Sequence, residues 1–183
     1  DLLTPDPEKV HDILAEPIIV VNLSEHGFDK IQKLPRFIKK EGNRIPAADF
    51  FGQRDAKKYA IEFKTIRMEN NPKPQEGKPI GNAFIPSWWR TMFRNNIITK
   101  IEDKDRRVLS QLDNTQKHMG CDYKMLALYN RRMGPSTLMD LRAYEEELTF
   151  IKGRYEEIDY IFFKDYFGQV VVYPPFSFVG RVS

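Results

Sequence analysis

The segment that most restricts how this chain folds is residues 59–66, YAIEFKTI, in which apolar and polar side chains alternate. Alternation with a period of two is typical of a β-strand with one buried face. Ile61 and Phe63 are then expected to face a core, while Glu62 and Lys64 share the opposite face. Two ionisable side chains on a half-buried strand need a reason to be there, so this segment is the first candidate for chemistry.

Two further strands are predicted immediately before this one. Residues 36–40 and 44–51 have strand character, and Glu41-Gly42-Asn43 between them is typical of a turn. Residues 52–57 are expected to form a polar turn that leads into 59–66. The predicted structure of this region is a meander of three antiparallel strands.

The rest of the chain predicts helices and a few more strands around this meander. The expected helical segments are 8–16 (ended by Pro17), 27–34, 87–101, 104–119 (closed by Gly120) and one opening at Ser136; the expected strands are 18–21, 123–129, 158–163 and 169–173, the last two as a hairpin. Residues 69–86, rich in Pro, Gly and Asn, are expected to form a long loop. This order predicts an α/β (α+β) protein with a mixed β-sheet flanked by helices. We expect one domain over 1–183, with its core at about 36–130 and a C-terminal helix and hairpin at 136–173.

Asp49 lies on the strand that precedes Glu62. If the chain folds back through the turn near 53–57, the two carboxylates come close in space. Two neighbouring carboxylates form a hard-oxygen site suited to Mg²⁺, which keeps several waters and binds few protein ligands. Lys64 is then placed to orient or deprotonate an attacking water and to stabilise charge on a phosphate. These residues predict a metal-dependent phosphodiesterase.

At this point the sequence resembles the PD-(D/E)xK nuclease superfamily, which includes restriction endonucleases and DNA-repair nucleases. The match consists of Pro46 and Asp49 followed by Glu62-Phe63-Lys64, and it extends over about 36–130, including a helix with Gln111 and the strand 123–129. The resemblance implies a restriction-endonuclease-like core, with Asp49 and Glu62 binding Mg²⁺ (or Mn²⁺ as a substitute) and Lys64 assisting catalysis. It also implies an accessory role for Gln111, since some members carry a glutamine on this helix.

The sequence departs from the family pattern in three places. Two alanines separate Pro46 from Asp49, where many members have the two residues adjacent. Thr115 stands four positions after the glutamine, where one branch carries a tyrosine. Many members supply an acidic residue from the first helix, and here three residues stay open for that place: Asp12, Glu16 and Glu25.

The charge balance allows a nucleic-acid partner without requiring one. The chain has 29 basic and 26 acidic side chains, for a net charge of +3. Arg90, Arg94 and Lys100, on the expected helix 87–101, are the candidate contacts to phosphate. Phe93 and its apolar neighbours on this helix recur at helical spacing, so we expect them in the core rather than stacked on bases.

The remaining composition excludes several classes of protein. A single cysteine, Cys121, rules out an intramolecular disulfide and a cysteine-rich zinc site. No apolar run approaches the roughly 20 residues of a membrane span, and we expect a cytoplasmic protein without a membrane partner. The predicted function is a metal-dependent endonuclease acting on DNA in preference to RNA, with a homodimer left open. The alternatives are a catalytically inactive nucleic-acid- or protein-binding module of the same fold and an RNA-cleaving toxin domain.

Overall fold

The computed structural model describes residues 7–40, 42–66, 87–130, 141–165 and 168–176. They form three helices and eight strands, in the order α1 (Pro7–Glu25), β1 (Lys30–Lys33), β2 (Phe37–Lys40), β3 (Asn43–Pro46), β4 (Phe50–Arg54), β5 (Lys57–Ile66), α2 (Ser87–Met119), β6 (Tyr123–Asn130), α3 (Leu141–Arg154), β7 (Tyr160–Lys164) and β8 (Val170–Tyr173). Among the described residues, no helix combines the length and the apolar character that crossing a membrane requires.

Six of these strands form one mixed sheet, in the order β1-β4-β5-β6-β7-β8. The β5–β6 and β6–β7 pairs are parallel, and the other three pairs are antiparallel. Parallel neighbours need a crossover connection, and α2 and α3 lie in those two connections. The predicted mixed sheet with flanking helices is therefore confirmed, and so is the closing hairpin, as β7 and β8.

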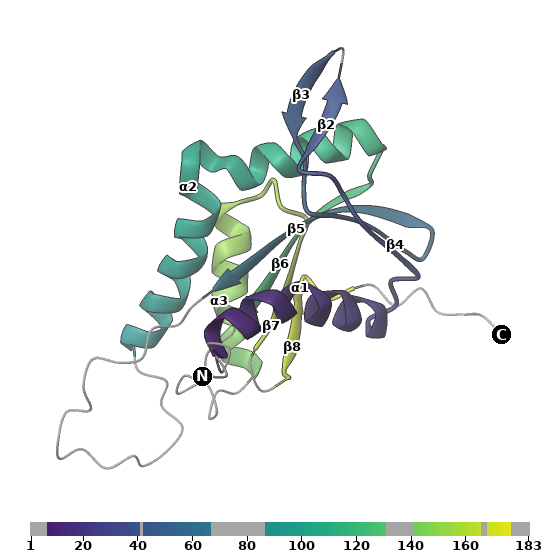
Figure 1. The fold of residues 1–183 in the computed structure, drawn as a ribbon. Coiled ribbons are helices and arrows are strands. Elements are labelled where there is room, and N and C mark those ends of the chain that lie inside the picture. The colour runs from purple at the N-terminus through teal and green to yellow at the C-terminus, as the bar shows by residue number, and fades with distance from the viewer. Residues whose placement is uncertain (1–6, 41, 67–86, 131–140, 166–167, 177–183) are drawn as a thin grey trace, which may run out of the picture.

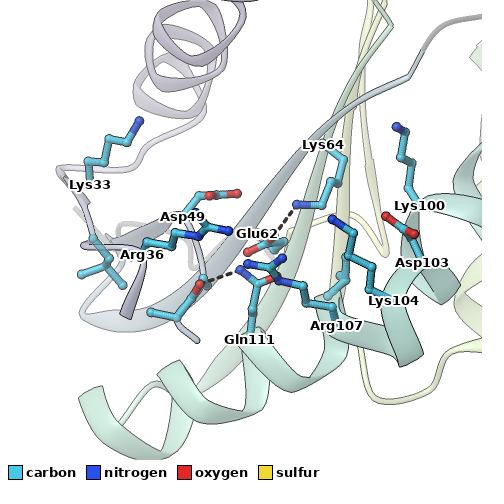
Figure 2. Close-up of a pocket in the computed structure, with 14 residues that line it drawn as sticks. Lys33, Arg36, Asp49, Glu62, Lys64, Lys100, Asp103, Lys104, Arg107 and Gln111 are labelled. Carbon is cyan, nitrogen blue, oxygen red and sulfur yellow. Dashed lines mark hydrogen bonds and ion pairs between the residues drawn. The ribbon is translucent and has the colours of Figure 1, made fainter. Parts of the chain in front are cut away.

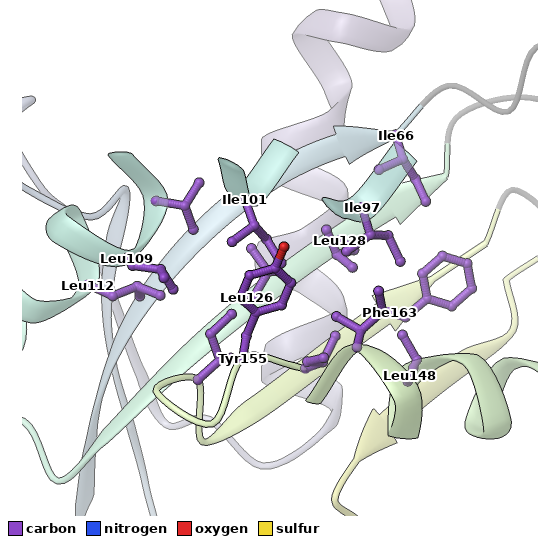
Figure 3. Close-up of a cluster of buried hydrophobic side chains, with 14 of the residues drawn as sticks. Ile66, Ile97, Ile101, Leu109, Leu112, Leu126, Leu128, Leu148, Tyr155 and Phe163 are labelled. Atoms are coloured by element: carbon purple, nitrogen blue, oxygen red, sulfur yellow. The ribbon is translucent and has the colours of Figure 1, made fainter. Parts of the chain in front are cut away.

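The helices cover the two faces of this sheet, with α1 on one face and α2 and α3 on the other (Figure 1). One apolar cluster joins α1 to the face of β5 that carries Ile61 and Phe63. A second cluster joins α2 and α3 to the face that carries Ala60 and Ile66, as Figure 3 shows. Because side chains alternate along a strand, Glu62 and Lys64 lie on the second face. The alternation predicted for this strand is confirmed.

The first helix corrects two predictions. Pro17 does not end it, and residues 18–21 continue the helix instead of forming a strand, so that α1 reaches Glu25. Ala15, Ile19 and Leu23 lie four residues apart and are almost fully buried. Burying a large apolar side chain contributes about 1.5–3 kcal/mol, so together they offset the roughly 3 kcal/mol that an interior proline costs. The predicted helical turn at 27–34 is also wrong, because this region contains β1, paired with β4.

The predicted strand 44–51 is two strands that belong to different sheets. β3 pairs only with β2 in a separate two-stranded sheet, whereas β4 joins the main sheet between β1 and β5. The break between them falls at residues 47–49, directly before β4. The predicted turn at 52–57 is shorter than expected, since β4 ends at Arg54 and β5 begins at Lys57. The predicted loop 69–86 lies outside the described residues.

Helix α2 contains a sharp break that matches the two helical segments predicted from the sequence. Asp103 has a non-helical backbone, and Lys104, Asp105 and Arg106 follow with φ of +50°, +57° and +60°. Left-handed backbone costs about 1–2 kcal/mol per residue that carries a Cβ, so this kink stores strain. The predicted helix opening at Ser136 is described only from Leu141, where α3 begins.

Candidate functional site

The β4–β5 pairing brings Asp49 beside Glu62. The register sets Phe50 opposite Ile61, so the next position along the same ladder sets Asp49 opposite Glu62. The carboxylate Oδ2 of Asp49 accepts a hydrogen bond of 2.9 Å from the backbone N–H of Phe63. On its other side, the Asp49 carbonyl accepts a hydrogen bond of 2.9 Å from the Leu34 N–H. Asp49 is thus held between β1 and β5, at the point where β4 begins.

Asp49, Glu62 and Lys64 line one cavity of about 400 Å³. Gln111 and Lys100, from α2, line it as well. The charged side chains around it are six cations and three acids: Lys33, Arg36, Lys64, Lys100, Lys104 and Arg107, with Asp49, Glu62 and Asp103. Figure 2 shows Lys64, Arg36 and Arg107 directed from different sides toward the centre, where the carboxylates of Asp49 and Glu62 lie. The cavity therefore places two carboxylates inside a ring of cations.

Glu62 is the most unusual side chain in this cavity, because it has no exposed surface. Its Oε1 accepts a hydrogen bond from the Lys64 ammonium, while its Oε2 has no hydrogen-bond partner in the described part of the chain. Burial raises the pKa of Glu62 from 4.5 to about 7; the Lys64 charge opposes the rise and the Asp49 charge adds to it. A buried carboxylate oxygen without a partner is costly, and such exceptions need an explanation.

The donor set in this cavity fits a hard divalent cation. Within the described ranges, no group of three or more His, Cys, Asp or Glu side chains lies close enough together to hold a metal ion. Mg²⁺ does not need such a group, since one or two carboxylates, waters and substrate phosphates commonly complete its shell. Asp49 and Glu62 are two such carboxylates, and the unpaired Oε2 of Glu62 is an available ligand atom.

Helix α2 fixes the chain segment that carries Asp49. Three side chains on it hold the backbone of residues 46–48: Asn114 Nδ2 donates to the Pro46 carbonyl (3.1 Å), Gln111 Nε2 donates to the Ala47 carbonyl (2.8 Å), and Thr115 Oγ1 accepts from the Ala48 N–H (2.7 Å). Both Gln111 and Thr115 are buried. These contacts hold the two alanines that separate Pro46 from Asp49. Gln111 therefore acts on the site by positioning this segment.

Two of the predicted phosphate contacts lie elsewhere and have acidic partners. Arg94 donates from both Nε and Nη2 to the buried carboxylate of Glu147 on α3, and Arg90 bonds the same carboxylate at 3.3 Å. Arg90 also pairs with Glu146 at 2.5 Å. Neither arginine lines the cavity, whereas Lys100 does. We therefore assign Arg90 and Arg94 to the α2–α3 packing and keep only Lys100 as a candidate contact.

Four cations of the cavity were not predicted from the sequence: Lys33, Arg36, Lys104 and Arg107. Arg107 had a readable signal, because it precedes Gln111 by four residues and so shares its helix face. Of the other three, Lys33 is the last residue of β1, Arg36 lies between β1 and β2, and Lys104 lies at the α2 kink. No local pattern connects these three positions to the motif residues.

The three acidic residues left open for the first helix differ in their positions. Glu16 pairs with Lys33, a residue of the cavity wall. Glu25 is exposed at the end of α1. The side chain of Asp12 lies outside the described part. Glu16 is thus the one of the two described residues that is connected to the cavity.

Comparisons with known proteins do not assign a family. No known family and no curated protein matches the sequence. A solved structure of Pyrococcus furiosus SfsA in complex with Ca²⁺ is similar over 91% of this chain, with 11% sequence identity and a TM-score of 0.30. The chain spans 62% of that SfsA chain. A TM-score this low carries no argument about function, so the function has to be argued from the site itself.

Proposed function

We propose that this chain is a metal-dependent endonuclease of the PD-(D/E)xK type, which hydrolyses phosphodiester bonds in DNA. The observation that carries the proposal is the buried, half-bonded carboxylate of Glu62, which lies beside Asp49 and Lys64 in a cavity ringed by cations. Most buried polar atoms of structural side chains have a hydrogen-bond partner, and a chance ion pair on a strand surface would not be buried. A carboxyl group in a cavity whose pKa is raised by burial and that has specific charged neighbours is a candidate for a functional site.

The residues divide into three chemical roles. Asp49 and Glu62 would hold the divalent cation, which when bound supplies Lewis-acid stabilisation of the phosphate and lowers the pKa of a water. Lys64 would orient the attacking water and contact a nonbridging phosphate oxygen, since its ammonium bonds Glu62 and faces the cavity. Gln111 would keep Asp49 in place through its bond to the Ala47 carbonyl.

The cations around the carboxylates favour a polyanionic substrate. Lys33 and Arg36 approach from the β1–β2 side, while Lys100, Lys104 and Arg107 approach from α2. Cations on both sides of a reaction centre bind the phosphates that flank the bond to be cut, and they raise the rate of encounter. A small neutral substrate would have no use for this arrangement.

The test is a cleavage panel with supercoiled plasmid, linear duplex DNA, single-stranded DNA and RNA, each with Mg²⁺, Mn²⁺ or EDTA. We expect cleavage of DNA with either metal, none with EDTA, and none by Asp49→Asn. The matched control is Asp122→Asn, an exposed aspartate that does not line the cavity. Binding of nucleic acid without cleavage of any substrate would favour the inactive binding module, and cleavage confined to RNA would favour the toxin domain.

A further inference from the structure

The two-stranded sheet of β2 and β3 is a hairpin that projects from the body of the molecule (Figure 1). It is not hydrogen-bonded into the six-stranded sheet. At its base, the Ala47 N–H bonds the Arg36 carbonyl at 3.1 Å, and Arg36 itself lines the main cavity. The hairpin therefore starts at the edge of the candidate catalytic site. A ligand that it binds would be held next to that site.

The two faces of this hairpin differ in chemistry. Ile38 lies opposite Ile45, and these side chains are buried and half-buried, so that face packs toward the protein. Lys39 lies opposite Arg44 on the outer face, where both are exposed. Phe37 shares this outer face and is 41% exposed. The outer face thus combines two cations with an aromatic ring.

The cross-strand pair of Lys39 and Arg44 is unfavourable for the free protein. Like charges directly opposite each other on a sheet destabilise it. Among the described residues, neither side chain has an acidic partner. The repulsion between Lys39 and Arg44 lowers the stability of the free protein. An anion bound between or beside them would offset this repulsion and explain why the two residues are paired.

One face of α2 runs beneath the base of the hairpin. Arg107, Gln111, Asn114 and His118 follow one another at steps of four, three and four residues, the spacing of a single helix face. Arg107 and Gln111 line the main cavity. Asn114 and His118 line a second cavity of about 200 Å³, together with Lys117 and Ile45 of β3.

The base of the hairpin lies between these two cavities. Gln111 bonds the Ala47 carbonyl at 2.8 Å and Asn114 bonds the Pro46 carbonyl at 3.1 Å, so the middle of the α2 face is covered. Lys117 and His118 are exposed beyond it. Lys117 therefore lies on one side of the hairpin base and the cations of the main cavity lie on the other, which is the arrangement needed to contact two separate phosphate backbones.

We propose that the β2–β3 hairpin enters the major groove of duplex DNA. One DNA strand then passes through the main cavity, and Lys117 and His118 contact the opposite DNA strand. Arg107 and His118 are eleven positions apart, which corresponds to about 16 Å along the helix axis. The major groove is about 12 Å wide and admits a two-stranded ribbon, whereas the minor groove is only about 6 Å wide. This proposal rests on the proposed function in one respect only, namely that the DNA strand in the main cavity is the one that is cleaved.

The test is fluorescence anisotropy in EDTA with a short labelled DNA duplex, its single strand and an RNA duplex of the same sequence. We expect Lys39→Ala/Arg44→Ala to bind duplex DNA roughly tenfold or more weakly than the wild type, with a salt slope lower by about two. Lys117→Ala/His118→Ala should also weaken duplex binding, with a salt slope lower by about one, because this variant removes one lysine charge. Single-strand binding should change by less than about threefold in both variants, because it needs neither the groove nor the second backbone. The control is Lys57→Ala/Lys58→Ala, which removes two exposed cations from the start of β5.

Each outcome separates this proposal from the nuclease. If the wild type binds the duplex through the hairpin but cleaves no substrate, the nuclease proposal is wrong and the hairpin proposal is supported. Duplex binding that is unchanged in both double variants, or weakened equally by the Lys57/Lys58 control, overturns the hairpin proposal even if DNA is cleaved. Equal losses on the single strand or on the RNA duplex also overturn it, since the major groove of A-form RNA is too narrow for a ribbon. The thermal midpoint of each variant shows that the fold is intact.

Discussion

Two glutamates of this protein, Glu62 and Glu147, are equally buried and differently bonded. Neither side chain has exposed surface. Both oxygens of Glu147 are bonded by Arg94, and Arg90 adds a third contact. Glu62 has one oxygen bonded by Lys64, and its other oxygen has no partner in the described ranges. Burial alone therefore does not distinguish the two acids. What distinguishes Glu62 is an oxygen without a hydrogen-bond partner among the described residues, on a side chain that lines a cavity.

The difference follows from the chemistry of the cations. The planar guanidinium of Arg94 presents two donors that match both oxygens of a carboxylate, whereas the ammonium of Lys64 is a point charge. The arginines join α2 to α3, so their bonds stabilise packing between two helices. The lysine faces a cavity, so the oxygen that it leaves free is available to a ligand.

The largest expected effect is on cleavage and comes from removing Lys64, the cation bonded to Glu62. Lys64→Ala should reduce DNA cleavage by about 10²–10⁴-fold, since it deletes a group that handles a proton or stabilises charge. The fold should persist, because Glu62 can take up a proton when the Lys64 charge, which lowers its pKa, is removed. Metal binding should persist because Asp49 and Glu62 stay in place. The initial rate on supercoiled plasmid with Mg²⁺ and the thermal midpoint measure the two effects. The control is Lys58→Ala, and equal cleavage by both variants would remove Lys64 from the mechanism.

The next largest effect is on stability and concerns Glu147, whose two oxygens are both hydrogen-bonded. Arg94→Ala should lower the free energy of unfolding by about 3 kcal/mol, because it leaves the Glu147 carboxylate buried with only Arg90 as its partner. The cleavage rate of the folded variant should stay close to that of the wild type. Urea denaturation measures the free energy. The comparison variant is Lys57→Ala, whose pair with Asp122 is exposed and should contribute less than about 1 kcal/mol. A loss for Arg94→Ala no larger than this would show that the Glu147 cluster is not structural.

A third test compares the two glutamates by pH. Because the pKa of Glu62 is raised from 4.5 to about 7 in the folded protein, the folded state holds a proton that the unfolded state has released in this range. Stability without metal should therefore fall as pH rises from about 4.5 through about 7. Glu62→Gln should remove this fall and raise stability at pH above 7, on the order of 2 kcal/mol.

Glu147→Gln should do the opposite at the same pH, since it removes the charge that Arg90 and Arg94 share. Thermal midpoints of the metal-free variants across this pH range measure both effects. A Glu62→Gln variant that is destabilised at pH above 7, as Glu147→Gln is expected to be, would make Glu62 a structural carboxylate and weaken the case for the site.

The smallest effect separates the cavity cation from the packing cation. Binding of DNA in EDTA should weaken steeply as salt rises, and Lys100→Ala should lower the salt slope by about one. Arg90→Ala should leave the slope unchanged, because Arg90 is already paired with Glu146 and Glu147. Affinities measured over a series of salt concentrations test this. An equal change in both variants would return Arg90 to the nucleic-acid interface, and a flat salt dependence would argue against a nucleic-acid partner.

The sequence by itself determined the local pattern of the site. Alternation in residues 59–66 placed Glu62 and Lys64 on one face, and the short turn before them brought Asp49 within reach. Helical spacing likewise predicted the two halves of α2. These features depend on neighbours within a few residues, where side-chain direction follows directly from backbone period.

Only the tertiary structure decided which charges are free and where elements end. Arg94 and Lys100 both lie on the first half of α2 and were predicted alike as phosphate contacts, yet Arg94 bonds Glu147 and Lys100 lines the cavity. The local sequence of residues 18–21 predicts a strand. They are helical because Ile19 packs in the apolar cluster between α1 and the sheet. The reason is the same in both cases. The free energy of an ion pair or a buried side chain depends on segments that are distant in sequence, and a local pattern carries no record of them.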